Sequence, residues 1–425
     1  MIKKKRLFIN SVFKWSLVLL LNQIGIAKKT KAKSKPKVVV LGAGFGGASC
    51  ISYLSNFIDL IELVVVDKNR WIKTCPFSNL VIGNLLDESN ITFKPKFKTN
   101  VTVVVNELKF IDAERKKILF VDELSLDYDF LIISPGIGYK KNQIEGYSVN
   151  DQDNIPHCWD GENKISHFKK SLDSLENNCK VIISSPDYPY RCPPAPYERA
   201  SMIANFLKRK NIRFKILIFD SKNSFTKKNI FLREWQKIYG DSIEWISKKK
   251  GGLITRFEKR KVVNSYGEKI DGDFIHIIPQ QKAGKIIFDS KLCASDWCKI
   301  NPETFQLQNF KDIYVVGDSI DAGDMPKSAF SAESQAKILS LNLVNRILQK
   351  PYLNPVFLNT CYSFSTYDRA FSITSWYRLN STKDKIVSLG SSQSSENGLI
   401  GERMRESREA FGWYESITKN LYGSF

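Results

Sequence analysis

Apolar runs and glycine turns alternate in a fixed order near the start of the chain. The run Lys37–Leu41 is rich in β-branched residues and ends at a glycine cluster, Gly42–Gly47, after which the apolar spacing becomes helical. A second apolar run, Leu63–Val66, ends at Asp67. The order of strand, glycine turn, helix and strand with a terminal acid predicts a dinucleotide-binding βαβ unit.

Each residue of this unit has a physical task. Gly42 permits the tight turn, Gly44 lets the backbone approach a pyrophosphate, and Gly47 lets the helix pack closely on the strand. The free N–H groups of the helix N-terminus then face the phosphates. Asp67 is placed to accept hydrogen bonds from the hydroxyls of the adenosine ribose.

Two later strands favour FAD over NAD as the dinucleotide. Tyr128–Gly136 reads as a strand that ends in a tight turn, and Ile313–Asp318 reads as an apolar strand that ends in Gly317 and Asp318. Flavoproteins with two dinucleotide-binding domains use such an aspartate to bind the ribityl chain of FAD. Together with the first glycine turn, these segments predict an FAD-binding domain.

A second αβ segment lies between these motifs. Cys179–Ser184 and Ile216–Asp220 read as its first two strands, but the connecting segment Ser185–Pro194 has prolines and bulky side chains where a nicotinamide-binding domain needs glycine. We therefore predict a Rossmann-like domain without a phosphate cradle and an electron partner other than NAD(P)H.

The remaining sequence completes an α/β prediction. Lys337–Leu348 is expected to be a helix, Phe371–Tyr377 a short strand and Ser388–Gly398 a polar loop. A length of 425 residues with 43% hydrophobic content indicates several globular domains. The predicted fold has two Rossmann-like domains, as in glutathione reductase, and a small C-terminal α+β domain. The predicted domains are an FAD-binding domain from residues 37–150 and 285–350, a second domain 151–284, and a C-terminal domain 351–425.

Positive charge is concentrated at the N-terminus. Of a net charge of +20, residues 1–37 carry eleven Lys or Arg and no acid, which leaves +9 elsewhere. The basic run Lys3–Arg6, the apolar run Trp15–Ile26 and the small residues up to Ala27 predict a signal peptide over 1–27 and a basic spacer over 28–36. We expect export to the periplasm by a Sec or twin-arginine-like signal. A retained N-terminal anchor is the alternative.

The apolar run is shorter than the about 20 residues that a bilayer span needs, so no stable span is expected in the mature chain. No nucleic-acid motif accompanies the basic residues, so no nucleic acid partner is expected. The three histidines lie at no zinc-ligand spacing from the eight cysteines, and we expect no metal site. Because Cys-x-x-Cys-His is absent, any haem c must be on a partner subunit.

Several strings of uncommon residues resemble the flavoprotein subunit of flavocytochrome c sulfide dehydrogenase, a family related to sulfide:quinone reductase. The resemblance extends from about Lys37 to the C-terminus. The strings are Thr74–Asn79, Val81–Gly83, Ile144–Tyr147, Tyr190–Ala200, Ala283–Lys285, Met325–Ser328 and Leu358–Ser363.

This resemblance implies roles for three cysteines. Cys75 matches the cysteine that the family joins to FAD by a thioether, although Pro76 and Phe77 replace the family's usual aromatic-leucine pair. Cys192 and Cys361 match the family's redox-active disulfide beside the flavin. A structural disulfide is the alternative for that pair. Cys293 and Cys298 are near enough in sequence to form a second bridge, and the other three cysteines have core-like surroundings.

The resemblance also implies the activity. Sulfide is oxidised at the Cys192–Cys361 disulfide, the electrons pass to FAD, and a c-type cytochrome subunit accepts them. Glu198 matches a carboxylate that manages the proton of sulfide, with an ordinary exposed helix carboxylate as the alternative. Lys327 is expected to stabilise negative charge on the reduced flavin.

Two other functions remain open at this point. A sulfide:quinone reductase shares the architecture and the cysteine chemistry but uses a membrane acceptor, and it should carry apolar amphipathic helices near the C-terminus. The tail Glu402–Phe425 has charged residues crowded into its first turns and no long apolar face. A non-catalytic FAD-binding protein with structural bridges is the second alternative.

Overall fold

The first apolar runs form a five-stranded parallel sheet in the computed structural model, which describes residues 34–151, 154–159 and 164–423. Both faces of the sheet are covered, as its continuous apolar strands require, and Val38, Val39 and Val40 are fully buried. The strand order is β19-β9-β1-β2-β5. The bounds are β1 Lys37–Leu41, β2 Glu62–Asp67, β5 Val101–Val105, β9 Phe130–Ile133 and β19 Ile313–Val315.

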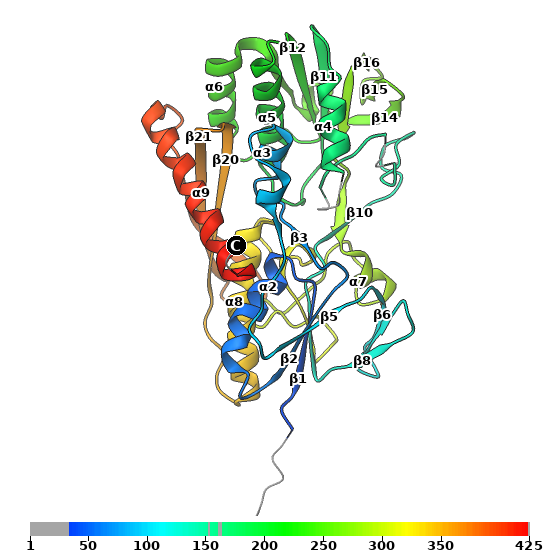
Figure 1. Ribbon diagram of the computed structural model, residues 1–425, viewed down its shortest axis with the longest axis vertical. Coiled ribbons are helices and arrows are strands. Elements are labelled where there is room, and N and C mark those ends of the chain that lie inside the picture. The colour runs from blue at the N-terminus through cyan, green and yellow to red at the C-terminus, as the bar shows by residue number, and fades with distance from the viewer. Residues whose placement is uncertain (1–33, 152–153, 160–163, 424–425) are drawn as a thin grey trace, which may run out of the picture. The chain divides into compact units, whose positions relative to one another are not determined.

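Two helices position the site at this sheet. Helix α2, Phe45–Leu54, starts directly after the glycine turn, and helix α8, Ala329–Ile347, packs along it (Figure 1). Smaller elements complete this half of the fold. They are β3 Ile72–Lys73, α3 Ser78–Ile82, β4 Thr92–Phe93, β6 Leu108–Asp112, β7 Lys117–Phe120, β8 Ser125–Asp127 and α7 Lys285–Asp289.

A second parallel sheet has the order β13-β12-β11-β17 and packs against helices α5 and α6. An antiparallel pair, β10 with β18, and a three-stranded meander, β14 to β16, accompany it. The bounds are β10 Ile137–Tyr139, α4 Ile165–Asp173, β11 Cys179–Ser185, α5 Ala195–Arg209, β12 Phe214–Asp220, α6 Lys228–Tyr239, β13 Ile243–Ile246, β14 Ile254–Glu258, β15 Lys261–Asn264, β16 Lys269–Asp271, β17 Phe274–Ile277 and β18 Gln281–Ala283.

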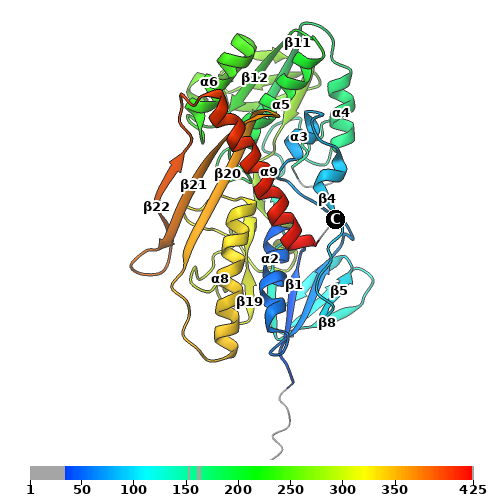
Figure 2. The same ribbon diagram turned by 60° about the vertical axis from the view of Figure 1, so that its left-hand side comes forward.

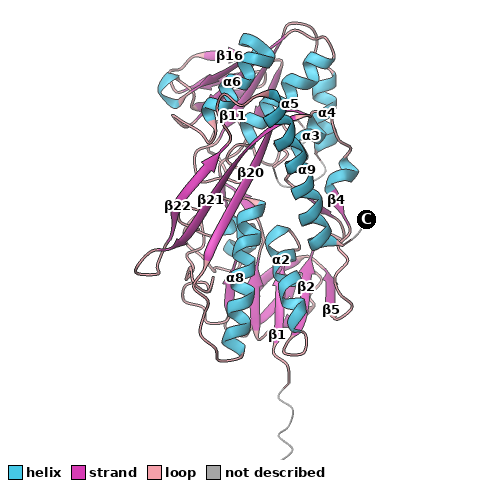
Figure 3. Ribbon diagram, turned by 90° about the vertical axis from the view of Figure 1, so that its left-hand side faces the viewer, coloured by secondary structure: helices cyan, strands magenta, loops and turns pink. Residues whose placement is uncertain are grey.

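The C-terminal segment forms an antiparallel sheet, β20-β21-β22, with helix α9 packed on β21 (Figure 3). Strand β20 contacts both α5 and α8, so it bridges the two Rossmann-like halves. Figure 2 shows α9 descending toward α2, where Tyr422 meets Phe45 at a ring distance of 6.3 Å. The bounds are β20 Val356–Thr366, β21 Arg369–Leu379, β22 Ile386–Gln393 and α9 Ile400–Tyr422.

The predicted α/β fold with two Rossmann-like parallel sheets is confirmed. The helix expected over Lys337–Leu348 is also confirmed, but it begins earlier, at Ala329, where the Ser328 hydroxyl caps it by accepting a hydrogen bond from Ser331 N. The polar loop expected over Ser388–Gly398 begins as strand β22, whose backbone pairs with β21 while most of its side chains face solvent. The predicted signal peptide, 1–27, and most of the spacer lie outside the described residues.

Candidate functional site

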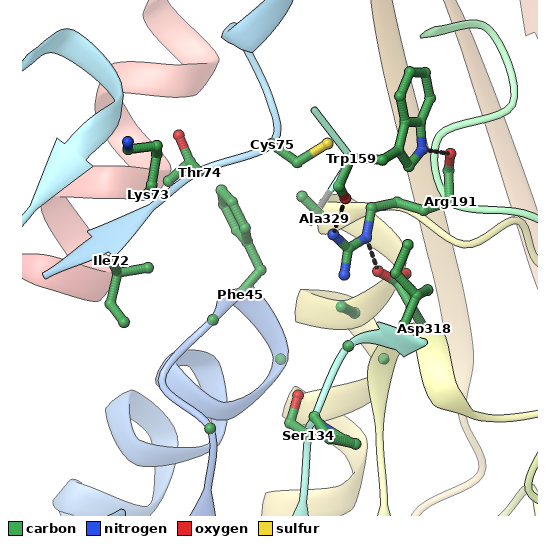
Figure 4. Close-up of a pocket in the computed structure, with 18 of the residues that line it drawn as sticks. Phe45, Ile72, Lys73, Thr74, Cys75, Ser134, Trp159, Arg191, Asp318 and Ala329 are labelled. Atoms are coloured by element: carbon green, nitrogen blue, oxygen red, sulfur yellow. Dashed lines mark hydrogen bonds and ion pairs between the residues drawn. The ribbon is translucent and has the colours of Figure 1, made fainter. Parts of the chain in front are cut away.

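A cavity of about 1820 Å³ lies where the first sheet, helix α5 and strand β20 meet. Its volume exceeds the roughly 300–1,000 Å³ of an ordinary small-molecule pocket, so a dinucleotide and a small substrate fit together. Its walls come from segments far apart in the sequence (Figure 4). The lining includes Gly42, Gly44, Asp67, Cys75, Arg191, Cys192, Glu198, Gly317, Asp318 and Cys361.

The glycine turn is shaped for a phosphate. Gly42 has φ +91°, and a Cβ there would lie 2.4 Å from the Ser134 carbonyl oxygen. A Cβ on Gly47 would lie 1.7 Å from the Gly42 oxygen, so the contact between helix and strand requires glycine. At Gly44 a Cβ would meet nothing within 4 Å, because this backbone faces the open cavity. Helix α2 therefore offers its N-terminal N–H groups to whatever fills that space.

Asp67 stands at the end of β2 on the cavity wall. Its carboxylate accepts hydrogen bonds from Ala43 N at 2.7 Å and from Asn69 N at 2.8 Å. Two carboxylate oxygens have about four lone-pair positions, so acceptor capacity remains for ribose hydroxyls.

Asp318 and Arg191 form an ion pair in the cavity wall. Arg191 Nε donates to Asp318 Oδ2 at 2.7 Å, and Arg191 Nη1 donates to the Trp159 carbonyl at 3.0 Å (Figure 4). Asp318 Oδ1 is buried and accepts no hydrogen bond within the described chain. A buried acceptor without a partner costs about 1–3 kcal/mol, so this oxygen fits a ligand hydroxyl such as those of a ribityl chain.

Lys327 lies next to this pair, but its ammonium is absent from the described cavity lining. Its Nζ donates to the carbonyls of Asp318 at 2.9 Å and Ile320 at 2.6 Å, and it lies 3.6 Å from the ring centroid of Trp297. Burial lowers the pKa of Lys327 to about 8. Its backbone oxygen accepts a hydrogen bond from Cys192 N at 2.7 Å. This bond links the segment from Gly317 to Lys327, called here the flavin motif, to the loop before α5 that carries Cys192.

Cys75 lies in the cavity wall, and Figure 4 shows its sulfur directed toward the side of Trp159 and Arg191. Burial raises the pKa of its thiol. The adjacent Phe77 has φ +70° and stacks on Tyr414 of α9 at 4.2 Å between ring centroids. This stacking holds the segment that carries Cys75 against the C-terminal helix.

Cys192 and Cys361 come together at the wall of the same cavity, one from the loop before α5 and the other from β20. Both are free thiols, and they lie close enough for each to shift the pKa of the other. Interaction with Cys361 raises the pKa of Cys192. Interaction with Cys192, together with the nearby charge of Lys227, lowers the pKa of Cys361 to about 7.

Glu198 is held beside the two thiols in the first turn of α5. Its Oε2 accepts from Asn79 Nδ2 at 2.6 Å and its Oε1 accepts from Phe364 N at 2.9 Å. Burial raises the pKa of this carboxyl. It is therefore not an exposed helix carboxylate.

Two buried cations near the thiols were not assigned from the sequence. Arg199 contacts Asn79 Oδ1 at 2.9 Å and lies 4.4 Å from the ring centroid of Trp159. Lys227 donates to Cys361 O and to Ser363 Oγ, both at 2.8 Å. Arg199 falls inside the string Tyr190–Ala200, whereas Lys227 belongs to no recognisable motif, so only the fold reveals it.

The remaining cysteines lie away from the cavity lining, and all eight cysteines are free thiols. Cys293 and Cys298, considered for a second bridge, lie close enough that Cys293 helps to raise the pKa of Cys298. The other three, Cys50, Cys158 and Cys179, are buried. Within the described ranges, no cluster of His, Cys, Asp and Glu is arranged to hold a metal ion, and no helix is long and apolar enough to cross a bilayer.

In the second Rossmann-like domain, side chains of the protein itself bind the acidic residue that would otherwise contact a nucleotide. Asp220, at the end of β12 where such a domain binds a ribose, is fully buried. It accepts from Tyr197 Oη at 2.5 Å and Trp245 Nε1 at 2.8 Å, and Lys222 Nζ lies 2.6 Å away. Because these side chains already bind the Asp220 carboxylate, it is not free to accept hydrogen bonds from an NAD ribose.

Comparison with known proteins agrees with this geometry. Residues 166–279 match the family model of the central region of the sulfide dehydrogenase [flavocytochrome c] flavoprotein chain, and residues 353–422 match its flavin-binding model. Residues 36–178 match the pyridine nucleotide-disulphide oxidoreductase model.

Individual relatives point in the same direction. The chain is 25% identical over 355 residues to the mitochondrial sulfide:quinone oxidoreductase of Dictyostelium discoideum, covering 78% of this chain and 75% of that protein. It is 47% identical over 45 residues to the sulfide dehydrogenase [flavocytochrome c] flavoprotein chain of Chlorobaculum thiosulfatiphilum, covering 11% of this chain and 94% of that sequence.

The fold is also found in a solved structure, the sulfide:quinone oxidoreductase of Aquifex aeolicus, with a TM-score of 0.70, 16% identity and 92% of each chain covered. The two family models, the flavin-sized cavity and the thiol pair on its wall agree with one another. Residues 166–279 and 353–422 therefore carry the central and flavin-binding regions of the flavocytochrome c sulfide dehydrogenase flavoprotein family, on a fold shared with sulfide:quinone oxidoreductase.

Proposed function

We propose that this protein is the flavoprotein subunit of a sulfide dehydrogenase, which oxidises sulfide through Cys192, Cys361 and FAD and passes the electrons to a c-type cytochrome. The observation that carries the proposal is the placement of these two thiols beside each other on the wall of the flavin cavity. Two cysteines distant in sequence are held in contact where sulfur chemistry and flavin reduction can be coupled.

The residues of the cavity fit FAD. The glycine turn and the start of α2 hold the pyrophosphate, Asp67 the adenosine ribose, and Asp318 Oδ1 a ribityl hydroxyl. When bound, the flavin supplies a sink that takes two electrons together and releases them singly. Cys75, on the same wall, is the residue for a covalent thioether to the cofactor.

The sulfur chemistry belongs to the cysteine pair in its disulfide form. Hydrosulfide attacks one sulfur, the S–S bond breaks, one cysteine becomes a persulfide and the other leaves as a thiolate. The low pKa of Cys361, about 7, supports a stable thiolate within the reduced pair near neutral pH. A second sulfide or thiol removes the outer sulfur of the persulfide. Glu198, half-buried beside both cysteines, takes the proton that sulfide releases.

A c-type cytochrome is our proposed acceptor. The match to models of the flavocytochrome c flavoprotein chain supports it, as does the occupied ribose position at Asp220, which disfavours NAD(P)H. The basic and apolar N-terminal pattern supports export to the periplasm by a Sec or twin-arginine-like signal.

Quinone is the second candidate acceptor, because two of the similar proteins are sulfide:quinone oxidoreductases. Purified protein given sulfide and either a soluble c-type cytochrome or a short-chain quinone distinguishes the two acceptors. We expect fast reduction of the cytochrome and slow reduction of the quinone. Fast quinone reduction without cytochrome turnover would replace the proposed acceptor.

The thiol relay is tested by an anaerobic sulfide titration of the purified flavoprotein. Sulfide should bleach the flavin absorbance of the parent protein, whereas C192S/C361S should retain flavin and lose bleaching. C293S/C298S is the matched control, because it removes another pair of adjacent thiols outside the cavity lining. Equal bleaching by both double variants refutes the relay. A parent protein that sulfide never bleaches is a flavin-binding protein of another kind.

A further inference from the structure

Lys227 is a buried ammonium without a carboxylate partner. It immediately precedes α6 in a left-handed conformation, φ +63°, and only 4% of its surface is exposed. Its Nζ donates to Cys361 O and Ser363 Oγ at 2.8 Å and to Phe371 O at 3.4 Å. All three acceptors are neutral. Burying an unpaired ammonium is unfavourable, so this placement calls for a nearby negative charge.

The carboxylates around Lys227 are bound to other groups. Glu198 accepts from Asn79 and from the Phe364 backbone. On the other side, Glu406 of α9 lies 3.5 Å from Arg403 and accepts a hydrogen bond from Ser372. Glu234 of α6 is paired with Arg369 and with Arg403. Glu198 and Glu406 still act on Lys227 through space, but among the described groups Cys361 has the largest charge effect on it.

The acidic group that best matches the ammonium of Lys227 is the thiol of Cys361. Lys227 Nζ already donates a hydrogen bond to the backbone oxygen of the same residue. The titratable groups that face this thiol are Cys192 from the loop before α5, Glu198 from α5 and Lys227. Tyr377 of β21 also faces it. Among these four, Lys227 is the cation. Its charge lowers the pKa of Cys361, whereas Glu198 raises it.

We propose that Lys227 is the positioning residue that stabilises negative charge on the Cys361 sulfur, so that Cys361 carries the charge and Cys192 the proton of the reduced pair. This inference rests on the proposed function for its catalytic meaning, but the electrostatic relationship holds in the absence of sulfide. Lys227 acts through Cys361 and does not line the described cavity itself.

The surroundings of the two sulfurs agree with this assignment. The Lys227 ammonium binds the backbone oxygen of Cys361, whereas no described residue donates a hydrogen bond to Cys192 Sγ. The asymmetry of the pair is therefore a property of the fold and not of the local sequence.

The test measures the acidity of Cys361 without using sulfide. In the C192S background of the flavin-loaded full chain, iodoacetamide alkylation of Cys361 is followed by mass spectrometry as a function of pH. K227M keeps the length of the side chain and removes its charge, whereas K227R keeps the charge. We expect K227M to slow alkylation at pH 7 at least tenfold and to approach the parent rate at high pH. K227R should stay within about threefold of the parent, since one pKa unit corresponds to a tenfold change in thiolate fraction.

K222M is the matched control, because Lys222 is a second buried lysine whose Nζ lies 2.6 Å from Asp220 and outside the cavity lining. It should leave the Cys361 profile unchanged. An unchanged profile in K227M overturns the inference. If K227M does not retain flavin, the test rests on K227R alone. An alkylation midpoint pH for K227R well above that of the parent then overturns the inference. A sulfide titration of the parent is run in parallel, so a shifted alkylation profile without sulfide bleaching would leave Lys227 in place and remove the proposed function.

Discussion

Arg191 Nε donates to Asp318 Oδ2 at 2.7 Å, and this ion pair leaves Asp318 Oδ1 as a buried acceptor without a partner in the wall of the flavin cavity. The guanidinium also binds the Trp159 carbonyl, and the Trp159 indole N–H donates to the Arg191 carbonyl at 3.1 Å. The loop that carries Cys192 is therefore fixed to the flavin motif by its neighbour. One residue orients both halves of the site.

Replacing Arg191 by Met should lower the stability and the flavin content of the protein together. Its side chain is 16% exposed and that of Asp318 is 14% exposed, and breaking such a buried pair costs about 3–5 kcal/mol because one charge is left without compensation. Denaturant unfolding and the flavin-to-protein absorbance ratio measure the two effects.

R260M is the control for this variant. Arg260 pairs with Asp273 at the surface, with side chains 73% and 45% exposed, and exposed pairs contribute about 0–1 kcal/mol. An R191M protein as stable and as flavin-rich as R260M would contradict the role of the Arg191–Asp318 pair.

Cys75 should determine whether the flavin survives unfolding. If its thiol forms a thioether, acid precipitation of the parent protein leaves yellow cofactor on the pellet, whereas C75S releases the cofactor to the supernatant. Noncovalent contacts at the glycine turn and Asp318 should still hold the flavin in the native C75S protein. C293S, a substitution outside the cavity lining, should behave as the parent. Complete release from the parent would show that Cys75 makes no covalent bond.

The fold of the first half was predictable because its signals are local. Uninterrupted β-branched runs, a glycine turn and an acid at a strand end lie within about thirty residues, and each has one physical reading. Strand β22 was missed for the opposite reason. Its backbone pairs with β21, but its Ser and Gly side chains mostly face solvent, so no apolar alternation marks it.

The site divides in a similar way. Cys75, Cys192 and Cys361 were found through resemblance, and Asp318 through the strand that precedes it. Lys227 was not found, because its role depends on contacts with residues more than 130 positions away. Helix α8 was placed too late because its first turns are made of small and polar residues that pack against α2 and the flavin motif instead of forming an apolar stripe.

NADH should not reduce this flavoprotein at a useful rate. Asp220 is fully buried and bound to Tyr197, Trp245 and Lys222, so an NAD ribose has no acceptor at the usual position. Anaerobic mixing with excess NADH should leave the flavin spectrum oxidised during the time in which sulfide bleaches it. Bleaching by NADH as fast as by sulfide would mean that the second Rossmann-like domain still binds a nicotinamide.

Glu198 should control the acid limb of sulfide oxidation. Burial raises the pKa of its carboxyl, so the group stays protonated above its ordinary range and cannot accept a proton there. The kcat/KM of the parent should therefore fall as the pH drops through this raised pKa. E198Q should lower turnover about 10²–10⁴-fold and remove this limb, because general base catalysis contributes on that scale. An E198Q profile that keeps the limb assigns it to another group.

Stability gives the same carboxyl a second, independent signature. A folded-state pKa above the unfolded value means that Glu198 favours the native state at low pH, and that this contribution is lost as the pH rises through the folded pKa. The free energy of unfolding of the parent should therefore decline relative to E198Q over that interval. Asp324 provides the control of opposite sign, since the Ser388 backbone N–H and Lys385 lower the pKa of its carboxyl. Its contribution is present above the unfolded value and is lost as the pH falls below it. The parent should therefore gain on D324N as the pH rises toward the ordinary Asp pKa, and lose on E198Q at higher pH, above the ordinary Glu pKa. Parallel pH profiles for the two variants would show that neither carboxyl is perturbed as the structure requires.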